Sequence, residues 1–183
     1  MKYAFADPPY YGYAKYYKKN HPESYVWDDL DTHQALIESL TNEYDGWALC
    51  LASVNLVDIL PLCPKEVRIC SWVKPFASFK PGINPAYTWE PVIIHNPRKK
   101  RSKDEWTIKD HLICNISMQK GLMGAKPILF CEWVLQLLGV QSTDEIIDIF
   151  PGTGIFEKSR KVFFNQSRII PSFPSHEMNG GSE

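Results

Sequence analysis

The sequence of 183 residues lacks several patterns that mark whole classes of protein. No apolar run approaches the roughly 18 residues that a membrane-spanning helix needs, and residues 1–7 are too short for the apolar part of a signal peptide. The formal net charge of −1 argues against a protein that coats nucleic acid through bulk positive charge. We therefore expect a cytoplasmic protein that does not bind a membrane.

Patterns typical of metal sites and disulfides are also missing. The cysteines are Cys50, Cys63, Cys70, Cys114 and Cys131, an odd number without a C-x-x-C pair, and the histidines show no metal-ligand spacing. Cys50, Cys70 and Cys131 lie inside apolar runs, which predicts buried thiols in a reducing compartment. We expect neither disulfides nor a metal cofactor.

What is present fits one globular domain with a core, since hydrophobic residues make up 44% of the chain. Buried strands are predicted at residues 2–6, 47–52, 67–73, 87–95 and 145–150, and helices at residues 32–44, 55–60, 127–138 and 155–164. Asp31 would cap the first helix, with Gln34 at the capping-box position, and Gly139 would end the third. Residues 10–27, 74–85 and 96–110 read as loops, and 171–183 as a disordered tail. This alternation predicts an α/β fold whose sheet is largely parallel.

The first strand runs directly into Asp7-Pro8-Pro9-Tyr10. Each proline favours an extended conformation in the residue before it, so Asp7 and Pro8 are both held extended. The Asp7 carboxylate and the Pro8 carbonyl could each accept one hydrogen from the N6 amine of adenine, and fixed acceptors stabilise the charge that develops there. Tyr10 could stack on the base, which would have to flip out of a duplex first.

The last predicted strand ends in a second turn, Asp148-Ile149-Phe150-Pro151-Gly152-Thr153-Gly154. Glycines at alternate positions let a backbone approach a ligand closely, and the amides of a following helix could meet a carboxylate. The turn lacks the third glycine and the downstream acidic residue of a dinucleotide fingerprint. Taken alone, this sequence is as typical of a plain strand–helix turn as of a ligand-binding turn.

Together the two turns resemble the catalytic D-P-P-Y motif and the cofactor motif D-x-F-x-G-x-G of the DNA amino-methyltransferases. Lys126-Pro127 resembles the K-P helix that flanks the methionine end of their cofactor, and residues 71–75 and 89–94 resemble their W-x-K-P and E-P segments. The catalytic motif comes first, as in the beta class of this family. Asp7 favours adenine N6 as the target, since S-P-P-Y would suggest cytosine N4.

The resemblance implies a Rossmann-like, S-adenosylmethionine-dependent methyltransferase sheet with helices on both faces, reduced at both termini. It implies a domain at residues 1–170, with target recognition in residues 74–120, that methylates a flipped adenine in DNA. Asp7, Pro8, Pro9 and Tyr10 would then be catalytic. The expected S-adenosylmethionine contacts are Ala6, Asp7, Lys126, Asp148, Phe150, Pro151, Gly152, Thr153 and Gly154.

Two basic stretches are candidates for contacts to DNA phosphates. One comprises Arg98, Lys99, Lys100, Arg101 and Lys103 in a polar loop, and the other Lys15, Lys18 and Lys19 among tyrosines beside the catalytic turn. Such binding would be sensitive to salt. Solvated or mobile surface loops are the alternative interpretation of both stretches.

The chain departs from the family in two places. Only residues 1–6 precede D-P-P-Y, where beta-class members usually have a strand–helix segment, and no acidic residue lies between Lys158 and Phe173 to hold the ribose hydroxyls. Two alternatives to an active DNA enzyme therefore stay open. One is a catalytically weak protein with the methyltransferase fold that binds nucleic acid or serves as a partner subunit, and the other is an RNA adenine methyltransferase. For each alternative, a second subunit or a homodimer stays open.

Overall fold

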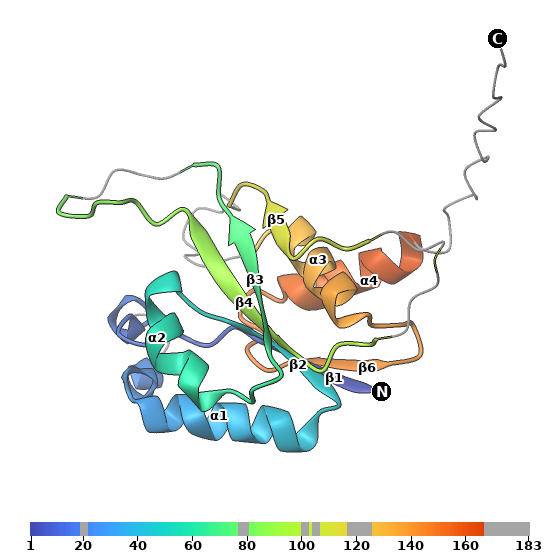
Figure 1. Ribbon diagram of the computed structural model, residues 1–183, viewed down its shortest axis with the longest axis horizontal. Helices are drawn as coiled ribbons and strands as arrows, with labels where there is room; N and C mark the ends of the chain where they lie inside the picture. Colours follow the sequence, from blue (N-terminus) through green and yellow to red (C-terminus); the bar gives the residue numbers. More distant parts are fainter. Residues whose placement is uncertain (19–21, 77–80, 100–102, 104–106, 117–125, 167–183) are drawn as a thin grey trace, which may run out of the picture.

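The computed structural model describes residues 1–18, 22–76, 81–99, 103, 107–116 and 126–166. A six-stranded sheet in the order β5-β3-β4-β2-β1-β6 forms its centre (Figure 1). The strands are β1 (Lys2–Ala6), β2 (Gly46–Cys50), β3 (Arg68–Val73), β4 (Trp89–His95), β5 (His111–Ile113) and β6 (Glu145–Asp148). β4 is antiparallel to β2 and β3, whereas the other neighbours pair in parallel. The prediction of a largely parallel α/β sheet is confirmed.

Helices cover both faces of this sheet (Figure 1). α1 (Leu30–Glu43) and α2 (Leu56–Ile59) pack on one face, and α3 (Ile128–Leu138) and α4 (Ile155–Gln166) pack on the other. Successive strand residues point to opposite faces, so Tyr3 and Phe5 join the core under α3 and α4, while Ala4 and Ala6 join the core under α1. Burial on both faces explains why β1 and β2 are continuous apolar runs.

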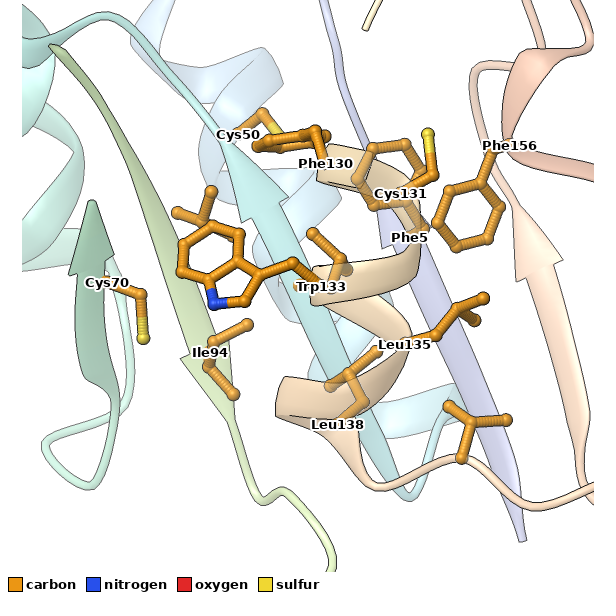
Figure 2. Close-up of a cluster of buried hydrophobic side chains, with 14 of the residues drawn as sticks. Phe5, Cys50, Cys70, Ile94, Phe130, Cys131, Trp133, Leu135, Leu138 and Phe156 are labelled. Carbon is orange, nitrogen blue, oxygen red and sulfur yellow. The ribbon is translucent and has the colours of Figure 1, made fainter. Parts of the chain in front are cut away.

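Aromatic side chains fill the core between the sheet and helices α3 and α4 (Figure 2). The ring of Phe5 stacks on Phe156 of α4, with 4.2 Å between the ring centroids and 4° between the planes. Phe130 of α3 meets Phe5 edge to face at 6.4 Å. Full burial of such a side chain contributes about 1.5–3 kcal/mol. These contacts fix α4, and the turn before it, against β1.

The cysteines are free thiols in this fold, and the three that lie in apolar runs, Cys50, Cys70 and Cys131, are buried as predicted. Gly139 ends α3 with a left-handed φ of 69°, which also agrees with the sequence. Among the described helices, none has the length and apolar composition needed to span a membrane. The predicted disordered tail at residues 171–183 lies outside the described residues.

The predicted cap of the first helix is wrong. Asp29 is the N-cap of α1, and its side chain accepts a hydrogen bond from the backbone N–H of Asp31 at 3.1 Å. Gln34 donates to Glu38 at 2.8 Å and takes no part in a capping box. Asp29 and Asp31 are both suitable caps, and the helix pattern alone does not decide which of them enters the first turn.

Three other segments differ from the prediction. The expected loop at residues 10–27 contains 3-10 helices at Ala14–Tyr16 and Pro22–Asp28, and the expected helix at 55–60 is α2 between the 3-10 turns Ser53–Asn55 and Leu60–Leu62. β5 was not predicted, because three residues are too short to show a strand period. β4 and β5 both lie within residues 74–120, so only the segments around these strands can form a target-recognition region outside the sheet.

The first residue of β2 tests the packing of this sheet. A Cβ atom on Gly46 would lie 2.5 Å from the carbonyl oxygen of Asn96 and 3.0 Å from that of His95. We expect Gly46→Ala to destabilise the fold by about 1–3 kcal/mol, because backbone atoms must move to make room. Urea unfolding measures this loss.

Gly82→Ala is the control, since Gly82 has a positive φ of 74° and no atom of the described residues lies within 4 Å of its Cβ position. It should cost only about 1 kcal/mol, from backbone strain alone. An unfolding midpoint for Gly46→Ala equal to that of the unchanged protein would contradict the close approach of β2 to the end of β4.

Candidate functional site

β1 and β6 form the point where the sheet changes its direction of winding. The two strands are adjacent and parallel, with Phe5 opposite Asp148. The helix after β1 packs on one face of the sheet, and the helix after β6 packs on the other. Such a switch point leaves a crevice beyond the carboxyl ends of the two strands, where α/β proteins bind ligands. The turn at residues 7–10 and the turn at residues 149–154 directly follow these two strands.

The turn after β6 has the conformation expected of a ligand-binding glycine turn. The Asp148 carboxylate accepts a hydrogen bond from the backbone N–H of Phe150 at 3.1 Å, and Ile149 donates to the carbonyl of Phe5 at 2.9 Å. Gly152 and Gly154 have left-handed φ values of 43° and 69°. No described atom lies within 4 Å of a Cβ position on Gly154. The turn is therefore open in front of α4, whose first amides have no partner within the helix.

Five side chains from four parts of the chain meet beside the turn after β1, and we call them the carboxylate–lysine cluster. They are Asp7 and Tyr10 of the turn, Lys74 after β3, Glu90 of β4 and Lys126 before α3. Lys126 Nζ donates to both carboxylate oxygens of Asp7, at 2.8 and 2.7 Å, and to the Tyr10 hydroxyl at 3.1 Å. That hydroxyl lies 3.0 Å from Glu90 Oε2 and 3.3 Å from Asp7 Oδ1. Lys74 forms an ion pair with the other oxygen of Glu90.

The charged neighbours in the cluster offset the effect of burial on Lys126 and Glu90. Burial alone would lower the pKa of Lys126, which is 7% exposed, but the carboxylates of Asp7 and Glu90 raise it well above its usual value. Burial would likewise raise the pKa of Glu90, yet Lys126 and Lys74 lower it below its usual range. Burial, with Asp7 and Glu90 close by, raises the pKa of Tyr10 well above 10. The phenol is therefore neutral, and the cluster pairs two anions with two cations.

This arrangement suits acceptance of hydrogen bonds from an amine better than covalent catalysis. Both oxygens of Asp7 accept from Lys126, and Oδ1 also lies within reach of the Tyr10 hydroxyl, whereas Oδ2 retains a lone pair for another donor. Burial raises the pKa of the neighbouring Cys50 thiol well above its ordinary value, which makes it a poor nucleophile. Within the described part of the chain, no group of His, Cys, Asp or Glu residues is arranged to bind a metal ion.

The structure brings the predicted catalytic and cofactor residues together at one edge of the sheet. Pro8 and Ala6 are buried in support of Asp7, whereas Pro151, Gly152 and Thr153 are exposed. Lys126, expected beside the cofactor, contacts Asp7 directly. The segments that hold Lys74 and Glu90 resemble family motifs in the sequence, but neither residue was predicted to belong to the site. The signal that could have identified Lys74 and Glu90 was a charged residue at the end of an apolar strand.

The basic run that starts at Arg98 lies at the opposite edge of the sheet, where the parallel strands begin, because the antiparallel β4 ends there. We call this the amino edge, and we call the edge with the two turns the carboxyl edge. Arg98 is engaged within the protein, where its guanidinium donates to Asp144 at 2.6 Å and to the carbonyl of Gly139 at 3.0 Å. Lys99 and Lys103 are exposed and line a cavity of about 410 Å³ at this edge. Lys100 and Arg101 lie outside the described residues. A role of this run in DNA binding stays a prediction, at a distance from Asp7.

The second basic stretch lies close to the catalytic turn in sequence and in the fold. Lys15 and Lys18 are exposed, and Lys15 lies over the ring of Tyr16, with 5.3 Å between its Nζ and the ring centroid. Lys19 lies outside the described residues. The 3-10 helix that carries Lys15 follows directly from Tyr10, whose carbonyl accepts a hydrogen bond from the N–H of Tyr13 at 2.9 Å.

The site predicts an unusual pH dependence of stability at Asp148. Burial raises the pKa of its carboxyl group from 3.8 to about 6, so its contribution to stability is lost as pH rises from about 4 to about 6. Asp148→Asn removes the charge and keeps an oxygen for the N–H of Phe150. We expect the variant to be more stable above pH 6, by on the order of 1 kcal/mol because solvent screens a half-exposed group.

Thermal unfolding of both proteins between pH 4 and pH 8 checks this expectation. The difference in midpoint should be small at pH 4, where the carboxyl group is protonated in the folded protein, and should grow with pH. A variant that is less stable than the unchanged protein at pH 7 would show that the Asp148 carboxylate is favourably placed in the fold.

Comparison with known proteins places the fold. The chain matches no family model and no curated protein. It is similar in structure to the crystal structure of the M1.HpyAVI–SAM complex, with a TM-score of 0.58 and 14% identity over 89% of this chain and 77% of the other. It is also similar to the crystal structure of M1.HpyAVI, with a TM-score of 0.53 and 12% identity over 89% and 76%. The predicted α/β fold is therefore confirmed as one that this chain shares with M1.HpyAVI.

Proposed function

We propose that the protein is an S-adenosylmethionine-dependent methyltransferase that modifies the N6 amino group of adenine in DNA. One observation carries the proposal: the D-P-P-Y turn and the glycine turn meet at the switch point of a fold shared with M1.HpyAVI, which was crystallised with SAM. Each turn is ambiguous alone. Their meeting on adjacent strands, across more than half of the chain, is what a two-substrate site requires.

The residues at the switch point fit the proposed cofactor. S-adenosylmethionine supplies an electrophilic methyl group on a sulfonium, and its amino-acid end carries an ammonium and a carboxylate. The Asp148 carboxylate and the open glycine turn at residues 152–154 suit close approach of a cationic ligand. Lys126 is the buried cation that could meet the carboxylate. Ala6, Asp7, Phe150 and Pro151 complete the proposed cofactor contacts.

Asp7 and Pro8 are the proposed acceptors for the target amine. The lone pair of an aromatic amine is delocalised into its ring, so the nitrogen attacks only as its hydrogens are drawn toward acceptors. Lys126 and Tyr10 hold the Asp7 carboxylate in place, so a small turn of its oxygens toward the amine is enough to stabilise the developing positive charge. The hydroxyl of Tyr10 is occupied within the cluster, which leaves its ring for stacking on the base.

Exposed aromatic residues surround the same edge of the sheet and suit contacts with unstacked bases. Phe76, Tyr87 and Trp89 are exposed in or beside the loop that joins β3 to β4, next to Lys74 and Glu90. Lys15 and Lys18 on the other side of the catalytic turn would contact phosphates. We therefore place the DNA-binding surface at the carboxyl edge.

Cofactor binding is the first expected property. The purified chain should release or absorb heat on titration with S-adenosylmethionine, and Gly152→Val should weaken binding about tenfold or more, because its side chain would occupy the open space of the glycine turn. Gly82→Val is the control, since Gly82 also has a positive φ but lies in the β3–β4 loop. Absence of binding at millimolar ligand, or equal binding by Gly152→Val, would contradict the cofactor assignment.

Methyl transfer is the second expected property. Asp7→Ala should reduce the rate by about 100- to 1,000-fold, because it removes one preorganised electrostatic partner of the transition state. Binding of S-adenosylmethionine should change far less. The assay is tritiated methyl transfer to unmethylated DNA, followed by mass spectrometry of the nucleosides.

The product distinguishes the alternatives. N6-methyladenine should form with the unchanged protein and be lost with Asp7→Ala. Methylcytosine would contradict the adenine assignment, and a product on RNA alone would move the substrate to RNA. Cofactor binding without any product would favour the partner-subunit alternative.

A further inference from the structure

We propose that Glu90 is a positioning residue for methyl transfer: it takes over Lys126 as an ion-pair partner and holds the Tyr10 hydroxyl when Asp7 turns to the target amine. The proposal rests on the proposed function for its reaction. The exchange of ion-pair partners that it describes is a property of the fold, and it can be tested without any substrate.

The first step is that Lys126 needs an anion at all times. Its side chain is 7% exposed, and its ammonium donates to both oxygens of Asp7. A buried ammonium without a partner is strongly unfavourable. When Asp7 accepts hydrogens from an amine, its oxygens are drawn away from Lys126. With Asp7 as the sole anion, each such movement would leave the buried lysine underpaired.

The second step is that another anion lies within reach. Glu90 Oε2 is 3.9 Å from Lys126 Nζ, which is ion-pair distance but too long for a hydrogen bond. A movement of about 1 Å by the end of a flexible lysine side chain would close this gap to the usual 2.9 Å. The Tyr10 hydroxyl already bridges the two groups, since it accepts from Lys126 at 3.1 Å and lies 3.0 Å from Glu90 Oε2. Lys126 can thus pass from one carboxylate to the other without losing its partners.

The third step is that Glu90 is held as an anion and does not act as a base. Lys74 pairs with its second oxygen, and the ammonium of Lys74 lies over the ring of Trp72, 4.8 Å from the centroid. Lys74 and Lys126 lower the pKa of Glu90 despite its burial. Such a carboxylate is a poor acceptor for the proton that leaves the methylated amine. Its position serves to orient Lys126 and Tyr10.

A double-variant cycle in thermal unfolding tests the exchange of partners. We compare Asp7→Asn, Glu90→Gln and the double variant, because both amides keep the shape of the side chain they replace. If Lys126 can use either carboxylate, each single variant lowers the midpoint modestly. The double variant, which leaves Lys126 without an anion, lowers it by more than the sum of the two. An additive double variant would overturn the proposal.

Two further variants control this cycle. Asp110→Asn removes a carboxylate that pairs with Arg68 at the opposite edge of the sheet, and its effect should add to that of Glu90→Gln without synergy. If the double variant is unfolded, adding Lys126→Met removes the unpaired charge and should restore folding. Failure of this triple variant to fold better than the double variant would also overturn the proposal.

The second measurement concerns the reaction itself. Glu90→Gln should lower kcat by on the order of 10- to 100-fold, because Asp7 and Tyr10 lose their support, while KM for DNA and Kd for S-adenosylmethionine change little. In a Tyr10→Phe background, the same substitution should have a smaller effect, since the hydroxyl that Glu90 holds is gone. Unchanged kcat in Glu90→Gln would overturn the positioning role.

The two measurements separate the failure of this inference from that of the proposed function. If the unchanged protein methylates nothing but the double variant shows synergy in unfolding, the proposed function fails, and the exchange of ion-pair partners stands without its reaction. If the unchanged protein methylates DNA and the double variant is additive, the inference fails alone.

Discussion

Parallel pairing of β1 with β6 is the constraint on which the rest of the structure depends. These strands lie at opposite ends of the described chain, and Lys2 through Phe5 align with Glu145 through Asp148. Pairing over such a separation gains nothing from local structure, so side chains packed on the sheet must stabilise it. The stack of Phe5 on Phe156 and the burial of Ile146 under α3 provide that packing. The two motif-bearing turns are neighbours only because this pair forms.

The amino edge fixes the register of the same pair. Asp144 immediately precedes β6, its side chain is 4% exposed, and it accepts hydrogen bonds from the Met1 ammonium at 2.9 Å and from Arg98 at 2.6 Å. The start of β1, the start of β6 and the end of β4 are thus joined at one carboxylate. A register slip of one residue would break these contacts and turn Phe5 to the wrong face. Arg98 is therefore important for the placement of the site, although it lies far from Asp7.

Much of the fold could be predicted from the sequence, because its signals are local. The sequence alone shows the apolar runs of β1, β2 and β6 and the helical pattern of residues 128–138. It also shows the prolines and glycines of the two turns. β5 and the cap at Asp29 were missed, because three residues are too short to show a strand period and Asp29 and Asp31 are both suitable caps. The long-range pairings depend on how all of these elements pack together.

In the candidate site, too, residues within one motif could be predicted, whereas residues that meet only through strand pairing could not. Asp7, Tyr10 and the glycine turn were assigned to the candidate site from the sequence, because each motif lies within at most seven consecutive residues. Lys74 and Glu90 were not assigned, because their meeting depends on the β3–β4 register, in which Trp72 lies opposite Glu90. That register puts Lys74 diagonally across from Glu90 on the same face, at a distance that long side chains can bridge. The basic run at Arg98 was predicted to contact DNA without a position in the fold, because sequence order cannot show that β4 runs antiparallel.

The charged residues at the two edges of the sheet have different roles. At the amino edge, an anion and two cations pair where they hold the strands in register. At the carboxyl edge, burial raises the pKa of Asp148 to about 6, and Asp7 adds a second negative charge nearby. Buried ion pairs often contribute no more to stability than well-packed apolar residues would. Charged groups with perturbed pKa values beside an open glycine turn are typical of functional sites. The charges at the carboxyl edge therefore support the proposed function more than they account for folding.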